Sequence, residues 1–246
     1  MGKRNIIEVS TVDILEGLVA NTARKIKIKS VEVLPEGLFK LEVDNVYFLI
    51  PVCTYEIDGN NYKVIEIDGC NSVTVKGKKG SEPEPPSGIE FDLPAPFFWH
   101  GTVRLTSAEW DQVKKENKIF PAVYALEPIL DKFDNDPVSL FDRVSSFTLF
   151  AITTVDKNDW FTDEHYLNAI NPLRRWIKEF KGELEKPNSG IGKFDSFDII
   201  NRANLGVLKK NQGNTANLTN YQVSGCEFSA SLPIKIDLSC KFACKC

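Results

Sequence analysis

The segment from Val144 to Leu184 constrains the fold more than any other part of this chain. Residues 144–153 are rich in β-branched and aromatic side chains and are apolar on both faces, which is typical of a central strand covered on both sides. After a polar turn, apolar residues recur every three or four positions, which predicts an amphipathic helix over residues 162–185. Its apolar face comprises Tyr166, Ile170, Leu173, Ile177, Phe180 and Leu184. Pro172 interrupts this stripe, so we expect a kink there or a helix that begins anew at this residue.

The first 80 residues predict a short helix followed by an antiparallel β unit. Ser10 and Asp13 have the spacing of a helix cap. The apolar face of the helix would comprise Ile14, Leu15, Leu18 and Val19. Alternating and β-branched segments then predict strands at 24–29, 39–43, 46–50, 54–57, 62–67 and 72–76. The strongest hairpin signal among them is the Asp-Gly-Asn-Asn sequence of residues 58–61.

Residues 81–90 belong to a stretch rich in proline, glycine and serine and are predicted to form a linker loop. In residues 91–246 we expect strands at 97–105, 121–127, 144–153, 194–200, 225–232 and 234–238, helices at 106–117 and 162–185, and an irregular segment at 128–142. The predicted fold class is therefore α+β: an antiparallel or mixed sheet flanked by two helices, with an N-terminal antiparallel β-rich unit. The predicted division is 1–80 for the helix and β-rich unit, and 91–246 for the α+β domain.

The overall charge argues against one class of partner. The 246 residues carry a net charge of -4, with a pI near 5.4, which argues against a protein that wraps nucleic acid with its own surface. The same balance is compatible with a passage through which DNA slides. No apolar run approaches the roughly 20 residues needed to cross a membrane. The N-terminal residues lack the apolar core of a signal peptide, so we expect synthesis in the cytoplasm.

The cysteines match no standard metal or disulfide pattern. Three of them are isolated, at positions 53, 70 and 226. The other three, Cys240, Cys244 and Cys246, form a cluster whose spacing matches no zinc site and has no histidine nearby. We expect reduced thiols, and metal binding or a redox role for the C-terminal cluster is the alternative.

Two histidines invite a catalytic interpretation that the surrounding residues do not support. Asp163, Glu164 and His165 fall in the first turn of the predicted helix, where acidic side chains offset the helix dipole and adjacent residues point in different directions. His100 has no partner serine or cysteine in a nucleophile elbow. A small hydrolase would require Asp163, His165 or His100 to converge in one pocket.

An acidic segment resembles part of a calcium-binding loop. Asp131, Asp134 and Asp136 have suitable spacing, but Phe133 and Pro137 interrupt the pattern and no glycine or terminal glutamate completes it. A solvated acidic loop is the better interpretation. We therefore assign no catalytic, cofactor-binding or metal-binding residue and expect a protein that is not an enzyme.

Five short segments occur in a distinctive order between residues 91 and 185. They are LPAPFFWHGT at 93–102, FPAVYALEPI at 120–129, SFTLFAI at 146–152, DWFTDEHY at 159–166 and INPLR at 170–174. This order resembles uncharacterised proteins of bacteriophages and prophages of the Bacteroidetes group, which are associated with the neck and tail-completion module of the virion. The resemblance implies a small α+β fold with a sheet flanked by helices. It carries over no functional residue.

The resemblance also implies a role and a set of partners. The role is a structural one: a ring-forming adaptor that joins head to tail or terminates the tail. The partners would be other copies of the chain in a ring of 6 or 12 subunits, the portal or connector and tail-tube proteins, and genomic DNA that passes without sequence-specific binding. Neither a membrane nor a cofactor is expected. The protein would be made in the host bacterial cytoplasm and would reside in the neck or tail of the virion.

Extended loops and aromatic residues are candidates for contacts between subunits. Loops 78–90 and 128–143 are candidate inter-subunit arms. Residues 97–99 and Trp160 are candidate contacts, for which a place in the core is an equally good interpretation. The alternative function is a carbohydrate- or protein-binding baseplate or adhesion module, which exposed aromatic residues lining a groove would favour.

Overall fold

The computed structural model describes residues 10–46, 49–51, 53–78, 80, 82–102, 121–133, 143–154, 162–186, 191–194, 196–205 and 223–235. Within these ranges the chain forms one six-stranded sheet, one five-stranded sheet and two main helices. The α+β fold class is therefore confirmed, with strands making up most of the structure. None of the described helices is long and apolar enough to cross a membrane.

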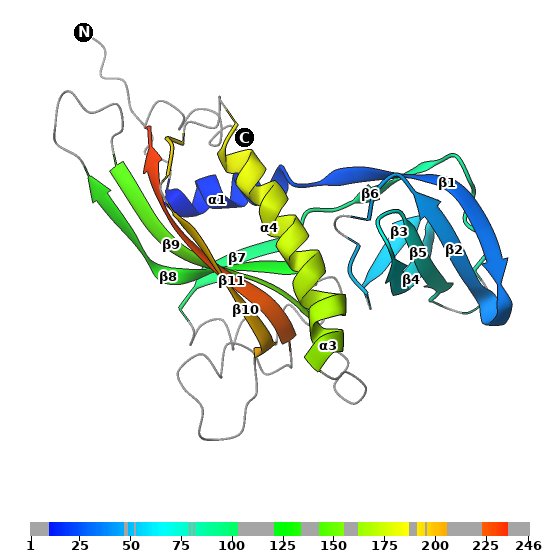
Figure 1. The fold of residues 1–246 in the computed structure, drawn as a ribbon. Helices are drawn as coiled ribbons and strands as arrows, with labels where there is room; N and C mark the ends of the chain where they lie inside the picture. Colours follow the sequence, from blue (N-terminus) through cyan, green and yellow to red (C-terminus); the bar gives the residue numbers. More distant parts are fainter. Residues whose placement is uncertain are drawn as a thin grey trace, which may run out of the picture.

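The six-stranded sheet is antiparallel throughout and is rolled toward a barrel. Its strands are β1 (Arg24–Leu34), β2 (Leu38–Val43), β3 (Thr54–Ile57), β4 (Asn60–Asp68), β5 (Ser72–Gly77) and β6 (Glu90–Leu93). Their order is β3-β4-β5-β2-β1-β6, and the outer strands β3 and β6 approach each other (Figure 1). We call this unit the barrel lobe. The predicted N-terminal β-rich unit is thus confirmed, including the tight hairpin between β3 and β4.

One predicted strand of the barrel lobe is wrong. Residues 46–50 were expected to pair, but Val46, Leu49 and Ile50 lie outside every strand although all three are buried. The amide of Leu49 donates a hydrogen bond to the carbonyl of Val46, at 3.2 Å, as in a turn. The apolar side chains of Val46, Leu49 and Ile50 therefore indicate burial in the core and not a β-strand.

The five-stranded sheet is mixed. Its strands are β7 (Phe97–Gly101), β8 (Ala122–Phe133), β9 (Arg143–Thr154), β10 (Phe197–Leu205) and β11 (Val223–Ile234), in the order β10-β11-β9-β8-β7. Only β7 and β8 are parallel. As predicted, β9 is the central strand. Residues 149–153 are buried on both faces, whereas residues 143–148 alternate between buried and half-buried.

Two strands of this sheet pass through prolines that the sequence led us to treat as boundaries. The predicted irregular segment is wrong up to Phe133, because β8 continues to that residue; positions 134–142 lie outside the described residues. Pro128 falls in the register shift between Leu126 and Leu130, where the ladder is interrupted, so no donor is lost.

The strand β11 is likewise one element where two were expected. It pairs with β10 only as far as Ala230. Pro233 therefore lies beyond the β10 ladder, and its carbonyl accepts a hydrogen bond from the amide of Gly192, at 2.8 Å. A proline is tolerated there because no strand needs its missing amide. Residues 236–238, which end the last predicted strand, lie outside the described residues.

Both main helices cover the same face of the five-stranded sheet. Helix α1 (Thr11–Ala20) begins with the predicted capping box between Ser10 and Asp13 and buries the predicted apolar face. The long predicted helix is divided into α3 (Thr162–His165), a π-helical turn over Tyr166–Ile170 and α4 (Asn171–Leu184). The apolar side of α4 packs on the sheet, where Trp176 and Phe180 contact the ring of Phe228.

The π-helical turn explains one error in the predicted apolar stripe. Pro172 lies in the first turn of α4. This agrees with the expectation that a helix begins anew at this residue. The preceding π turn begins at Tyr166 and contains more residues per turn than an α-helix, so its first residue is rotated out of the stripe. Tyr166 is accordingly 39% exposed, whereas Ile170 and the later stripe residues are buried.

The chain crosses between the two sheets twice. Helix α1, which we grouped with the N-terminal unit, contacts α4, β7 and β8. Strand β6, which follows the predicted linker, pairs with β1 in the barrel lobe. We therefore call α1, α3, α4 and β7–β11 the sheet lobe, and Figure 1 shows it beside the barrel lobe. The predicted helix at 106–117 and Trp160 lie outside the described residues.

Candidate functional surfaces

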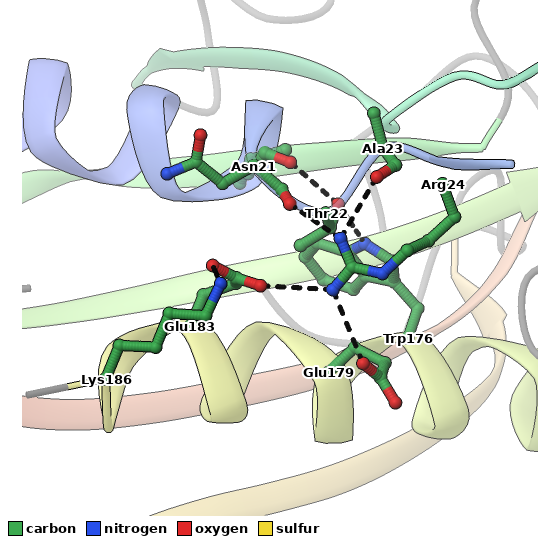
Figure 2. A network of polar contacts seen from close by, with 9 residues as sticks. Asn21, Thr22, Ala23, Arg24, Trp176, Glu179, Glu183 and Lys186 are labelled. Atoms are coloured by element: carbon green, nitrogen blue, oxygen red, sulfur yellow. Dashed lines mark hydrogen bonds and ion pairs between the residues drawn. The ribbon is translucent and has the colours of Figure 1, made fainter.

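A network of charges joins the two lobes (Figure 2). Arg24, the first residue of β1, donates from its guanidinium to the carboxylate of Glu183 on α4, at 3.0 Å. Glu179 lies 3.5 Å from the same guanidinium nitrogen, and Lys186 forms a second ion pair with Glu183. The side chain of Glu183 is only 3% exposed. A buried carboxylate without a cationic partner is costly, so this network holds the start of the barrel lobe against α4.

Hydrogen bonds to uncharged acceptors reinforce the same junction. The other terminal nitrogen of Arg24 donates to the backbone carbonyls of Asn21 and Ala23, at 2.9 and 3.0 Å. The indole of Trp176 donates to the hydroxyl of Thr22, at 2.9 Å, and both groups are buried. Figure 2 shows these bonds between the end of α1 and the inner face of α4. We refer to the charges and these bonds together as the joint.

The face of the five-stranded sheet opposite α4 carries an open groove of about 380 Å³. Its floor contains paired hydroxyls: Ser146 with Ser231, at 2.7 Å, and Thr148 with Ser229, at 2.9 Å. Leu126, Pro128 and Leu130 of β8 form one side, and Asp198 of β10 contributes a carboxylate. The paired hydroxyls satisfy one another, and the groove brings no histidine to them among its lining residues. The arrangement suits binding through hydrogen bonds and apolar contact.

The two histidines have different partners on different elements. Nδ1 of His100, on β7, lies 2.7 Å from the Glu127 carboxylate, and both side chains are partly exposed. Nδ1 of His165 lies 2.8 Å from the hydroxyl of Ser224, and both residues are buried. Asp163 is exposed in the first turn of α3, as expected for a residue that offsets the helix dipole. No contact among the described residues joins these groups into the pocket that a hydrolase would require.

The predicted solvated acidic loop is wrong at Asp131. This residue lies in β8, where its carboxylate accepts hydrogen bonds from the hydroxyls of Thr11 and Ser145 and lies 3.8 Å from the guanidinium of Arg143. It thereby ties α1 to the sheet. Asp134 and Asp136 lie outside the described residues. No cluster of three metal-ligating side chains occurs in the part of the chain that the structure describes.

Three thiols are described, and none forms a disulfide. Cys53 and Cys226 are buried, and Cys70 is exposed in the turn between β4 and β5. Desolvation raises the pKa of Cys53 from 9.0 to about 11 and that of Cys226 to about 12. Thiols with such pKa values are poor nucleophiles at neutral pH. The C-terminal cluster of Cys240, Cys244 and Cys246 lies outside the described residues.

Only one of the three aromatic residues at 97–99 is an exposed contact candidate. Phe97 is 41% exposed, whereas Phe98 packs against the main core. Trp99 lies against Tyr124, with ring centroids 5.3 Å apart, and Tyr124 in turn packs against Phe150. This row belongs to a second, smaller core on the face of the sheet opposite α4.

Segment 82–89, part of a candidate inter-subunit arm, is held against its own barrel lobe. The hydroxyl of Tyr62 donates to the carbonyl of Pro83, at 2.6 Å. The backbone of Ile28 bonds to both Gly88 and Ile89, at 2.8 and 2.9 Å. These contacts leave the described part of the loop in place on its own subunit.

Large apolar side chains are exposed at the two ends of the molecule. On the barrel lobe, Val33 is 59% exposed beside the turn that joins β1 to β2. At the end of β8, Leu130 and Phe133 are 66% and 52% exposed. In Figure 1 the β1–β2 turn lies at the right extremity and the end of β8 at the left extremity. No sequence signal singled out Val33, whereas Leu130 and Phe133 fall in segment 128–143, which was predicted to be an inter-subunit arm.

The comparisons with known proteins do not assign a family. No family model matches the chain, no curated protein matches it, and no solved structure matches its fold.

Proposed function

We propose that this chain is a structural virion protein of a tailed bacteriophage, a ring-forming adaptor of the neck or tail-completion module. The order of segments between residues 91 and 185 motivates the virion assignment. The observation that supports a ring is the pair of exposed apolar sites at opposite ends of the molecule. We call Val33 with the β1–β2 turn the barrel tip, and Leu130 with Phe133 the sheet end.

Two different sites on one subunit favour head-to-tail association. A two-fold dimer uses the same surface on both subunits, whereas a cyclic ring repeats a contact between two unlike surfaces. The barrel tip and the sheet end are unlike surfaces that lie far apart (Figure 1). At the barrel tip, Glu36 and Gly37 have φ values of 62° and 71°, which reverses the chain within three residues and presents a narrow projection. The tip of one subunit would contact the sheet end of the next.

A ring closes only if the rotation between successive subunits is fixed. That rotation depends on the angle between the two lobes, because each lobe carries one of the contact surfaces. The Arg24–Glu183 ion pair of the joint and the apolar core shared by the two lobes restrain this angle. A flexible connection would leave the number of subunits in the ring unspecified, because the rotation between neighbours would vary.

The test is the mass of the purified protein in solution, measured by light scattering over a concentration series. We expect a closed multiple such as 6 or 12 subunits, or a monomer that assembles when a portal or tail-tube protein is added. Val33→Asp and Phe133→Asp should each abolish assembly, because each removes one of the two unlike surfaces. Ile65→Asp is the matched control, since Ile65 is 43% exposed but lies on β4, three strands from β1 in the sheet order.

Mixing the two defective variants gives a sharper test. Val33→Asp retains the sheet end and Phe133→Asp retains the barrel tip, so the mixture has one intact interface and should stop at a heterodimer. A two-fold interface would not give this result. A concentration-independent monomer that ignores the portal and tail-tube proteins would contradict the ring.

The alternative is a carbohydrate- or protein-binding baseplate or adhesion module. The groove with its paired hydroxyls, about 380 Å³ in volume, is the observation that favours it. A monomer that is retained on immobilised glycans, and that loses retention when Thr148 and Ser229 are replaced by valine and alanine, would put this function first.

A further inference from the structure

The outer face of α4 carries a concentration of positive charge. The cations are Arg174, Arg175, Lys178 and Lys181, all exposed or half-buried. At 100° per residue they fall within about a third of the helix circumference, opposite the side that packs on the sheet. We call these four residues the α4 stripe. They span two turns, about 10 Å along the axis.

The acidic residues of α4 do not neutralise this stripe. Glu179 and Glu183 lie on the flank of the helix and pair with Arg24 and Lys186 in the joint. Glu185 pairs with Lys181, at 3.2 Å, at the C-terminal end of the stripe. Within the described part of the chain, Arg175 and Lys178 therefore have no acidic partner.

Arg174 adds a third uncompensated charge and is held in place. Its guanidinium donates to the amide oxygen of Asn201, at 2.8 Å, which orients the side chain without cancelling its charge. Three cations thus remain available on a rigid helix, although the whole chain carries a net charge of -4.

The helix dipole does not account for the stripe. Basic residues stabilise the last turn of a helix, where the backbone carbonyls concentrate negative charge. Arg174, Arg175 and Lys178 lie in the first two turns of α4, and the helical segment as a whole runs from Thr162 to Leu184. The charges therefore sit away from the end at which they would offset the dipole.

We propose that the α4 stripe contacts the phosphate backbone of duplex DNA, without reading its sequence. Positive side chains in a row complement the regular negative charge of the duplex, and arginine and lysine donate to phosphate oxygens. The inference rests on the proposed ring, in which α4 would face the passage and each subunit would add one stripe. Three cations per subunit give a contact that salt weakens readily, as a passage for moving DNA requires.

The experiment measures binding of a fluorescent 20-base-pair duplex to the full chain by anisotropy, at 50 and 200 mM salt. The test variant combines Arg174→Gln, Arg175→Gln and Lys178→Gln. The matched control combines Lys25→Gln, Lys29→Gln and Lys63→Gln, which removes the same charge from exposed positions of the barrel lobe. Two duplexes of unrelated sequence serve as probes.

We expect the native chain to bind both duplexes equally, with a slope of log affinity against log salt of about -2.7 per subunit. That slope corresponds to a roughly 40-fold loss between the two salt concentrations. The α4 variant should lose at least about tenfold in affinity at 50 mM salt, and the control variant less than about twofold. Equal losses in the two variants, or no binding by the native chain, would overturn the inference.

Light scattering on the same samples separates the two proposals. If the α4 variant forms the native oligomer but no longer binds the duplex, both proposals stand. If the native chain forms a ring that ignores DNA, the stripe is refuted and the ring survives. If the chain binds DNA through the stripe but stays monomeric with every partner, the ring is refuted and the DNA contact survives.

Discussion

Burial decides the chemistry of two thiols. Cys53 and Cys226 lie in the core, where a thiolate would lose its hydration, so their pKa values rise to about 11 and about 12. The charge of Arg174 opposes this rise at Cys226 but is outweighed by burial. Both residues therefore behave as small apolar side chains at neutral pH, and neither supports a redox or nucleophilic role.

The raised thiol pKa values predict a loss of stability in alkali. An unfolded cysteine releases its proton near pH 9, whereas the buried thiols keep theirs until about pH 11 or 12. Their contribution is fully present below pH 9 and is lost as the pH rises through these values. The free energy of unfolding should therefore fall above pH 9, by up to about 1.4 kcal/mol per pH unit for each thiol.

Urea denaturation between pH 8 and pH 10.5 measures this effect. The variant Cys226→Ala should show a shallower decline than the native chain, whatever its stability at pH 8. Cys70→Ala is the control, because Cys70 is exposed, and it should retain the native slope. Equal slopes for Cys226→Ala and the native chain would show that this thiol does not titrate as its burial requires.

At the scale of elements, two glycines show how packing and helix propensity act in opposite directions. A Cβ atom at Gly225 in β11 would lie 2.3 Å from the carbonyl oxygen of Ala151 in β9. Two central strands would have to separate to admit it. A Cβ atom at Gly182 in α4 would meet nothing within 4 Å. There the only effect of a methyl group is to reduce the backbone freedom of the unfolded chain.

Opposite changes in stability are therefore expected from the same substitution. Gly225→Ala should lower the free energy of unfolding by about 1–3 kcal/mol, the usual range for overpacking. Gly182→Ala should raise it by about 0.5–1 kcal/mol. Chemical denaturation of both variants under one set of conditions provides the measurement. A stable, native-like Gly225→Ala variant would mean that β9 and β11 are less closely paired than described.

At the scale of the whole molecule, the joint adds charged contacts between the two lobes to the apolar core that they share. Glu183 is nearly inaccessible and has two cationic partners, Arg24 from β1 and Lys186 beyond α4. Arg24 is the partner that crosses between lobes. Its removal leaves the buried carboxylate with Lys186 alone and deprives the carbonyls of Asn21 and Ala23 of a donor.

Arg24→Ala should lower the free energy of unfolding by about 1–3 kcal/mol, because a largely buried charge loses one of two partners. Lys25→Ala is the neighbouring control: its ion pair with Asp92 is exposed on both sides, at 68% and 82%, so the change should stay within about 0.5 kcal/mol. Urea denaturation of the two variants tests the difference. Equal effects would indicate that the joint adds nothing beyond a surface ion pair.

The sequence by itself determined the elements whose signals are local. The capping box at Ser10, the hairpin turn after Ile57, the central strand β9 and the apolar stripe of α4 each depend on residues within a few positions of one another. Capping, turn geometry and side-chain periodicity act at that range, so the pattern and the structure agree.

Only the tertiary structure decided the features that depend on distant partners. Pro128 and Pro233 remain within strands because their missing amides face gaps in the ladders, which no local pattern reveals. Val46, Leu49 and Ile50 are buried without pairing, and Arg24 meets a carboxylate 159 positions away. The exposed outer face of α4 likewise depends on the packing of its opposite side on the five-stranded sheet. Packing between segments far apart in the sequence supplies most of the energy of these arrangements, and local propensity does not encode it.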